Sequence, residues 1–150
     1  MIPDLRMAVA RVPGAVEAPL PTYGTEGASG MDLHAAILAS VTIRPGGRAR
    51  IPTGLAFAIP HHFEGQIRPR SGRAYQEGVT VLNAPGTIDA DYRGEVQVLL
   101  INLGENDVQI EPLDRIAQLV IVPVAYAELR LVQGLTPTLR GGGGYGSTGK

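Results

Sequence analysis

Cysteine is absent from the 150 residues, which excludes disulfide scaffolds, thiolate zinc sites and cysteine nucleophiles. An excess of basic residues is absent as well. The net charge of −1 argues against a general binder of nucleic acids or membrane surfaces, because such partners require positive charge. No apolar run is long enough to span a bilayer, and residues 1–10 lack the basic-then-apolar pattern of a secretion signal. We therefore expect a soluble cytoplasmic protein without nucleic-acid or membrane partners.

Long stretches without glycine or proline are few, because 20 glycines and 12 prolines are spread along the chain. Long helices are therefore not expected. Short apolar and β-branched runs between these residues predict strands. They lie at residues 41–43, 55–59, 64–68, 79–82, 96–102, 108–110 and 115–122, with a weaker one at 129–132. Residues 71–77 predict one short helix. About eight to ten short strands with one minor helix indicate an all-β antiparallel barrel or jelly roll.

Residues 140–150 are rich in glycine and have no apolar pattern, so we expect a folded domain over residues 1–139 and a separate arm. Residues 144–150 match the spacing of a phosphate-binding loop, but its strand, its helix and its magnesium-binding hydroxyl are missing. Successive glycine amides can still bind an anion. Two interpretations stay open: a floppy terminus, or a flap over a nucleotide with Arg140, Ser147 and Thr148 on the phosphates and Tyr145 on the base.

A second segment with ligand chemistry is Arg70-Ser71-Gly72, where a strand ends in a basic cluster and the short helix begins. With Ser71 as the capping residue, the amides at the start of the helix would favour an anion, helped by Arg70. The alternative is a capped surface helix with solvated arginines, since short capping patterns are common. The segment alone does not decide between the two.

A third segment, residues 83–95, combines a turn, an amide, carboxylates and an aromatic ring. Asn83 can pair with the amide edge of a base, Tyr92 can stack on a base or sugar, and a carboxylate can take a proton from water. Asp89 and Asp91 are two residues apart, so on a strand they would share one face and could chelate a cation. The alternative is a long hairpin loop whose Asp, Asn and Gly residues serve turns. The spacing does not show which aspartate acts as a base.

Five segments in this order resemble motifs of the trimeric dUTPase (dUTP diphosphatase) family. The resemblance runs through residues 28–33, 70–72, 83–92 and 114–118, and through Arg140 with residues 144–149. Its most specific part is the string Gly86-Thr87-Ile88-Asp89-x-Asp91-Tyr92-Arg93-Gly94. On their own, Asp32 after a glycine turn and Asp114-Arg115 before a strand would indicate only turns.

The resemblance implies a jelly-roll-like β-barrel of the β-clip type, assembled as a homotrimer whose active sites each take parts from three subunits. The arm, residues 140–150, would close a neighbouring site. The implied reaction is hydrolysis of dUTP to dUMP and diphosphate with Mg²⁺, which limits uracil in DNA and supplies dUMP for thymidylate synthesis. The triphosphate itself can bind Mg²⁺, so a dedicated cage of protein ligands is not required.

The resemblance also implies a role for each matching residue. Asp89 matches the base that activates the water attacking the α-phosphorus, Asn83 the residue that binds uracil, and Tyr92 the ring under the deoxyribose. Asp32 matches an acid that acts on magnesium through water. The remaining matches are substrate-binding positions: Arg70, Ser71 and Gly72 at the phosphates; Gly86, Thr87 and Ile88 in the uracil hairpin; Gln97 and Gln118; and Arg140, Tyr145, Gly146, Ser147 and Thr148 in the arm.

The sequence departs from the family pattern at several of its positions. Arg73 stands where the family usually has leucine, Leu113 replaces a frequent glycine, and Tyr145 replaces the usual phenylalanine. Gln97 stands where some members have lysine, which leaves its role open. Two alternatives use the same scaffold: a deaminase acting on dCTP, and a nucleotide-binding trimer without catalysis. A purely structural β-domain would leave the five ordered segments unexplained.

Overall fold

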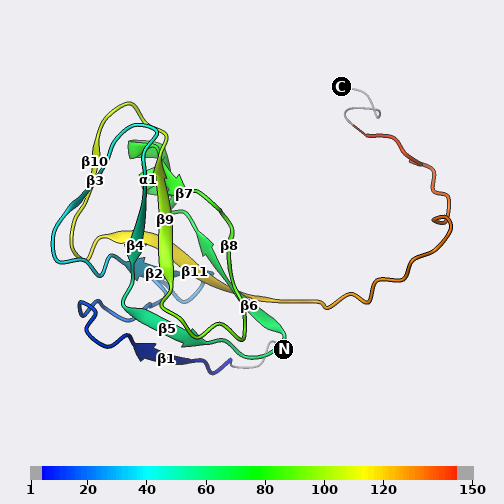
Figure 1. The fold of residues 1–150 in the computed structure, drawn as a ribbon, viewed down its shortest axis with the longest axis horizontal. Coiled ribbons are helices and arrows are strands. Elements are labelled where there is room, and N and C mark those ends of the chain that lie inside the picture. Colours follow the sequence, from blue (N-terminus) through cyan, green and yellow to red (C-terminus); the bar gives the residue numbers. More distant parts are fainter. Residues whose placement is uncertain (1–4, 145–150) are drawn as a thin grey trace.

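The computed structural model describes residues 5–144, which form a jelly-roll-like β fold with eleven strands and one short helix (Figure 1). The strands are β1 (Ala8–Arg11), β2 (Met31–His34), β3 (Val41–Ile43), β4 (Arg48–Pro52), β5 (Leu55–Ala58), β6 (Phe63–Arg68), β7 (Val79–Val81), β8 (Gly86–Ile88), β9 (Gln97–Asn102), β10 (Val108–Ile110) and β11 (Arg115–Pro123). The helix is α1 (Ser71–Glu77). Within residues 5–144, no helix has the length and apolar character needed to cross a membrane.

The strands form four antiparallel sheets whose neighbours are mostly distant in the sequence. The largest sheet has the order β2-β11-β6-β8, a second has the order β4-β9-β7, and β1 with β5 and β10 with β3 form pairs. Side chains alternate between the core and the outside, as the two-residue period of a strand requires. On β9, for example, Val98 and Leu100 are fully buried, whereas Leu99 and Ile101 on the other face are half-buried.

The strong strands expected from the sequence are all confirmed, and so is the helix at residues 71–77. The structure has more strands than expected, because β1, β2, β4 and β8 lack the signals used for prediction. Every residue of β1 is exposed, β2 and β4 carry charged residues, and β8 lies inside a cluster of turn residues. The weak strand at residues 129–132 is wrong: these residues are exposed and pair with no strand in the described part of the chain.

The longest strand, β11, lies between β2 and β6 and so brings together two segments that are far apart in the sequence. Gln118 on β11 lies opposite Asp32 of β2 and opposite Arg68 of β6. The register with β2 shifts between Arg115 and Ala117, which is a β-bulge. Without this shift, Arg115 and Gln118 would face opposite sides of the sheet, because they are three residues apart. With it, both residues lie opposite β2 residues that share one face, so one side of the sheet collects polar groups.

A buried asparagine holds the end of β9 to its surroundings. Asn102 is fully buried, and its Nδ2 donates hydrogen bonds to the carbonyl oxygens of Ile43 and Asn106, both at 2.8 Å. Its Oδ1 accepts a hydrogen bond from the amide of Gly104, also at 2.8 Å. A single amide side chain thus satisfies three backbone groups from β3 and the loop after β9, groups that would be costly to leave unpaired.

We predict that Asn102→Ala destabilises the fold strongly. The substitution leaves three backbone groups without partners, which should lower the free energy of unfolding by about 3 kcal/mol. For a chain of this length such a loss lowers the melting temperature by roughly 10 °C, measurable by differential scanning calorimetry. Asn106→Ala is the matched control, because only the backbone carbonyl of Asn106 takes part in these bonds. Equal melting temperatures for Asn102→Ala and the unsubstituted protein would contradict the prediction.

Candidate functional site

Residues from three of the sequence segments line one cavity of about 200 Å³. Asp32 comes from β2 and Gln118 from β11, whereas Arg70, Ser71 and Gly72 form the entry to α1. The sequence analysis expected an anion site at Arg70-Ser71-Gly72 and took Asp32 by itself for a turn residue. The structure brings these residues together into one polar group, which we call the phosphate half-site.

Asp32 is the centre of the phosphate half-site, because both of its carboxylate oxygens accept from arginines. Arg70 Nε lies 3.0 Å from Oδ1, and Arg115 Nη1 lies 3.3 Å from Oδ2. The Asp32 side chain is 25% exposed, so the pairs are only partly screened by water. Two guanidinium groups against one carboxylate leave an excess of positive charge, and each fork retains further N–H donors. Such an arrangement suits a phosphate group.

His34, two residues beyond Asp32 on the same face of β2, adds no charge at neutral pH. Burial lowers the pKa of His34 below its usual value of 6.5, and the positive charges of Arg115 and Arg70 lower the pKa further. The Asp32 carboxylate opposes this shift but does not reverse it. The positive charge of the phosphate half-site therefore comes from its arginines alone.

The loop before α1 is held by Gln118, not by the predicted serine cap. Gln118 Nε2 donates to the carbonyl oxygen of Pro69 at 3.0 Å. A Cβ at Gly30 would collide with the amide group of Gln118, which explains the glycine of the first segment. The helix begins at Ser71 as expected, but its N-cap residue is Arg70 and no side chain caps it. The expectation that Ser71 caps the helix is wrong, and its hydroxyl is exposed beside the cavity.

A second cavity, of about 410 Å³, collects residues of the third segment and is called the nucleoside half-site below. It is lined by Arg50, Thr87, Ile88, Asp89, Tyr92, Glu95, Val96 and Gln97. Gly86 is buried, and a Cβ there would come within 3.1 Å of Asn83 Nδ2. The amide of Asn83 therefore lies close to the Gly86 backbone. Neither Gly86 nor Asn83 lines this cavity.

Asp89 is exposed and lies in the turn that follows β8. Its carbonyl oxygen accepts a hydrogen bond from the amide of Tyr92 at 3.1 Å. Asp89 and Asp91 do not share the face of a strand, because both residues lie in this turn. Of the two alternatives for this segment, the structure has the loop. Among residues 5–144 no group of three acidic, histidine or cysteine side chains is placed to hold a metal ion. Of these two aspartates, Asp89 lines the nucleoside half-site and Asp91 does not. Both line a third cavity, of about 690 Å³.

Glu95 is a site residue that the sequence analysis missed. Its Oε1 accepts from the amide of Gly54 at 2.9 Å, and its Oε2 accepts from Gln97 Nε2 at 2.7 Å. Its carbonyl oxygen accepts from the hydroxyl of Tyr92 at 3.0 Å. Glu95 thus fixes two walls of the nucleoside half-site. The available signal was its place two residues before Gln97, which puts both side chains on one face of an extended chain.

The two half-sites lie far apart within one chain. Gly65 of β6 pairs with Ile88, so Asp89 lies beside the first residues of β6, whereas Arg70 follows the last residue of that strand. Six residues of extended chain separate Glu64 from Arg70, which corresponds to about 20 Å. The structure therefore brings most of the predicted residues together as two groups. Asp89 belongs to one of them, and Asp32, Gln118 and residues 70–72 form the other.

The segment after β11 leaves the sheets and runs outward as an extended chain (Figure 1). Four of its leucines, at positions 129, 131, 135 and 139, are at least 90% exposed. Arg140 donates from Nε to the carbonyl oxygen of Gly143 at 2.9 Å and lines neither half-site in this chain. The other predicted arm residues, Tyr145, Gly146, Ser147 and Thr148, lie outside the described residues.

Comparisons with known proteins agree on one family. A family model described as dUTPase matches residues 16–149. The deoxyuridine 5'-triphosphate nucleotidohydrolase of Sinorhizobium medicae (strain WSM419) is 58% identical over 132 residues, 87% of this chain and 82% of that protein. The protein of the same name from Rhizobium meliloti (strain 1021) is 55% identical over 145 residues, 95% of this chain and 91% of its own. The solved structure of the Staphylococcus bacteriophage 80alpha dUTPase with dUPNHPP has a TM-score of 0.87 at 26% identity, covering 97% of this chain and 99% of that one. This chain therefore belongs to the dUTPase family.

Proposed function

We propose that this chain hydrolyses dUTP to dUMP and diphosphate in the cytoplasm, with Asp89 as the general base. The family supports the reaction, and the relatives named above carry the corresponding name. One structural observation carries the mechanism: an exposed carboxylate, Asp89, borders a cavity whose other walls suit a deoxynucleoside. Such a reaction would limit uracil in DNA and supply dUMP for thymidylate synthesis.

In the nucleoside half-site the backbone of β8 and the amide of Asn83 bind the uracil edge. An amide offers both a donor and an acceptor, so it can pair with the edge of a base. The ring of Tyr92 lies under the deoxyribose, where it leaves no room for a 2'-hydroxyl. The hydrogen bond from the Tyr92 hydroxyl to Glu95 holds this ring in place, which makes the exclusion a property of the folded chain.

In the phosphate half-site Arg70, Ser71, Gly72 and Gln118 bind the phosphate chain of the substrate. Phosphoryl transfer depends mostly on positioning and on neutralising charge that spreads over the phosphate oxygens. The positive excess around Asp32 supplies this neutralisation, since Arg70 and Arg115 are both oriented by its carboxylate. We assign Arg115 to this group, although the sequence alone indicated only a turn at Asp114-Arg115 and gave Arg115 no role.

The donor set at the phosphate half-site fits magnesium bound mainly by the substrate. Asp32 is the one carboxylate lining this cavity, and a single carboxylate does not make a cage of protein ligands. Mg²⁺ usually keeps several of its waters and binds through substrate phosphates, so Asp32 would hold it through water. When bound, the ion would neutralise negative charge on the phosphates.

Hydrolysis follows from the position of Asp89. Its carboxylate takes a proton from a water molecule whose oxygen forms a bond to the α-phosphorus. The bond between the α-phosphorus and the bridging oxygen then breaks, and diphosphate leaves with the electron pair. A carboxylate that is exposed at the edge of a cavity can reach such a water, whereas one directed into the core could not.

The active site is completed by other copies of the chain in a homotrimer. A general base must lie within about 3 Å of the proton it accepts, yet about 20 Å of β6 separates Asp89 from Arg70 within one chain. The nucleoside half-site of one subunit must therefore face the phosphate half-site of another. A closed ring of three identical subunits makes three equal sites of this kind.

The arm crosses to a neighbouring subunit. Exposed apolar side chains such as Leu131 and Leu135 mark an interaction surface, and the sheets of their own chain leave them uncovered. Packing of these leucines on a neighbour would carry residues 140–150 toward its site. There Arg140, Ser147 and Thr148 would bind phosphates, while Tyr145 would cover the base beside Gly146. Closure would exclude bulk water from the reacting groups.

We predict that Asp89→Asn removes most of the activity without weakening binding. The amide cannot accept the proton, so the turnover number should fall by at least about a hundredfold while KM stays nearly unchanged. Asp91→Asn is the matched control, because Asp91 lies in the same turn and does not line the nucleoside half-site. Diphosphate release from dUTP with Mg²⁺ is the measurement. Equal turnover numbers for Asp89→Asn and the unsubstituted enzyme would remove Asp89 from its role.

Mixed trimers test whether the half-sites belong to different subunits. Asp89→Asn subunits keep an intact phosphate half-site, and Arg70→Met subunits keep the general base, Asp89. After refolding equal amounts together, about a quarter of the sites should combine both intact halves and recover that share of the activity. Each variant refolded alone should stay inactive. A mixture as inactive as its components would show that the site lies within one chain.

We also predict that a chain ending after Arg140 remains trimeric but turns over slowly. The leucines proposed to pack on the neighbour and Arg140 are retained. Tyr145, Ser147 and Thr148, which would cover the base and bind phosphates, are lost. Without closure of the site, kcat/KM for dUTP should fall by about a hundredfold. Steady-state kinetics and light scattering measure the two properties. Full activity in the shortened chain would contradict a role of the arm in closing the site.

A further inference from the structure

The helix that carries the phosphate-binding residues has almost no apolar anchor. None of the seven residues of α1 is buried, and no side chain caps its first turn. A helix of this length is not stable by itself in water. At its end, Gly78 adopts a left-handed conformation with φ of 72° and closes the last turn through its amide. Contacts at the first turn must therefore come from polar groups.

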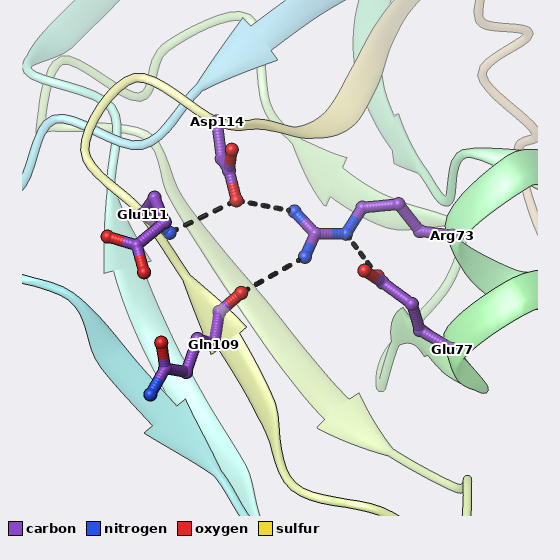
Figure 2. A network of polar contacts seen from close by, with 5 residues as sticks. All are labelled: Arg73, Glu77, Gln109, Glu111 and Asp114. Carbon is purple, nitrogen blue, oxygen red and sulfur yellow. Dashed lines mark hydrogen bonds and ion pairs between the residues drawn. The ribbon is translucent and has the colours of Figure 1, made fainter.

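Arg73 supplies these contacts, as Figure 2 shows. Its Nε donates to Glu77 Oε2 at 2.6 Å within the helix, and its Nη1 donates to Asp114 Oδ2 at 3.0 Å. Its Nη2 reaches the carbonyl oxygen of Gln109 at 3.4 Å. The Arg73 side chain is only 13% exposed. One planar fork thus joins α1 to the middle of β10 and to the turn before β11.

The turn held by Arg73 is itself tied to the strand that carries Asp32. The amide of Ala35 donates to the carbonyl oxygen of Asp114 at 2.8 Å, and the amide of Leu113 donates to Ala35 at 2.9 Å. Asp114 Oδ2 also accepts from the amide of Glu111 at 3.0 Å. Leu113 has a φ of 66°, a conformation that residues other than glycine rarely adopt. This turn therefore needs support from outside.

These contacts close a ring around the phosphate half-site. Asp32 joins β2 to Arg70 and to Arg115, Gln118 joins β11 to the loop before α1, and Arg73 joins α1 to the turn before β11. We infer that Arg73 is a positioning residue: through Asp114 it sets where Arg70, Ser71 and Gly72 stand relative to Asp32. The inference rests on the proposed function of these residues in binding the phosphates of dUTP.

Arg73→Met tests this inference, because methionine keeps the apolar stem and helix propensity but removes every donor. Misplaced phosphate-binding groups should raise both KM for dUTP and the inhibition constant of diphosphate by about tenfold. The turnover number should fall by less than about threefold, since Asp89 belongs to the other half-site. Arg73→Lys keeps the charge but not the fork, so its two constants should lie between those of Arg73→Met and the unsubstituted enzyme. Arg44→Met, an exposed arginine after β3, is the control.

Asp114→Asn extends the test and remains informative if Arg73→Met does not fold. It removes the charge that Arg73 binds while an oxygen acceptor remains for Glu111. If Arg73 acts through Asp114, the two substitutions should not be additive. The double variant should then show the KM of the single variant with the higher KM, not a KM raised by the product of the two changes. Unaltered constants in both single variants would overturn the inference. An unsubstituted enzyme inactive toward dUTP would instead contradict the proposed function, whatever the variants do.

Discussion

The ion pairs of Asp32 are the interaction on which the phosphate half-site depends. One carboxylate on β2 orients Arg70 from the entry to α1 and Arg115 from the start of β11. Pairs of this kind contribute little to stability when exposed, and these are only partly buried. Their effect is geometric: they fix two guanidinium groups that would otherwise repel each other. Without the carboxylate, the positive charges of the two arginines would push apart the segments that carry them.

The sequence signals predicted the strands with apolar alternation and the segments with unusual polar residues, including Asp89, Asn83 and Arg70. They could not predict how those segments pair. Asp32 and Arg115 are 83 residues apart in the chain, and Arg73 and Asp114 are 41 apart. Such contacts depend on strand order and on the bulge in β11, neither of which leaves a local pattern. The short strands β2 and β4 were not predicted either, because their charged residues interrupt the apolar pattern.

The separation of the half-sites is the structural reason for the assembly that we propose. A sheet strand such as β6 is stiff and extended, so Asp89 and Arg70 at its two ends cannot approach each other without breaking the sheet. A second copy can supply the missing half with no change in either fold. The exposed leucines after β11 are consistent with that proposal, because a segment that is to cover a neighbour would have to leave its own core.

The polar anchoring of α1 follows from what its first turn must do. The phosphate binding that we propose for this segment requires it to remain open to solvent, so apolar packing could not hold it without covering the site. An arginine fork can hold it from behind, and Arg73 does so at the expense of a turn in which Leu113 is strained by about 1–2 kcal/mol. A partly buried, charge-assisted hydrogen bond to Asp114 contributes a similar amount, about 1.5–3 kcal/mol. The strain in the turn and the Arg73–Asp114 hydrogen bond are therefore similar in size, and the helix keeps its place while its first residues, Ser71 and Gly72, stay exposed to solvent.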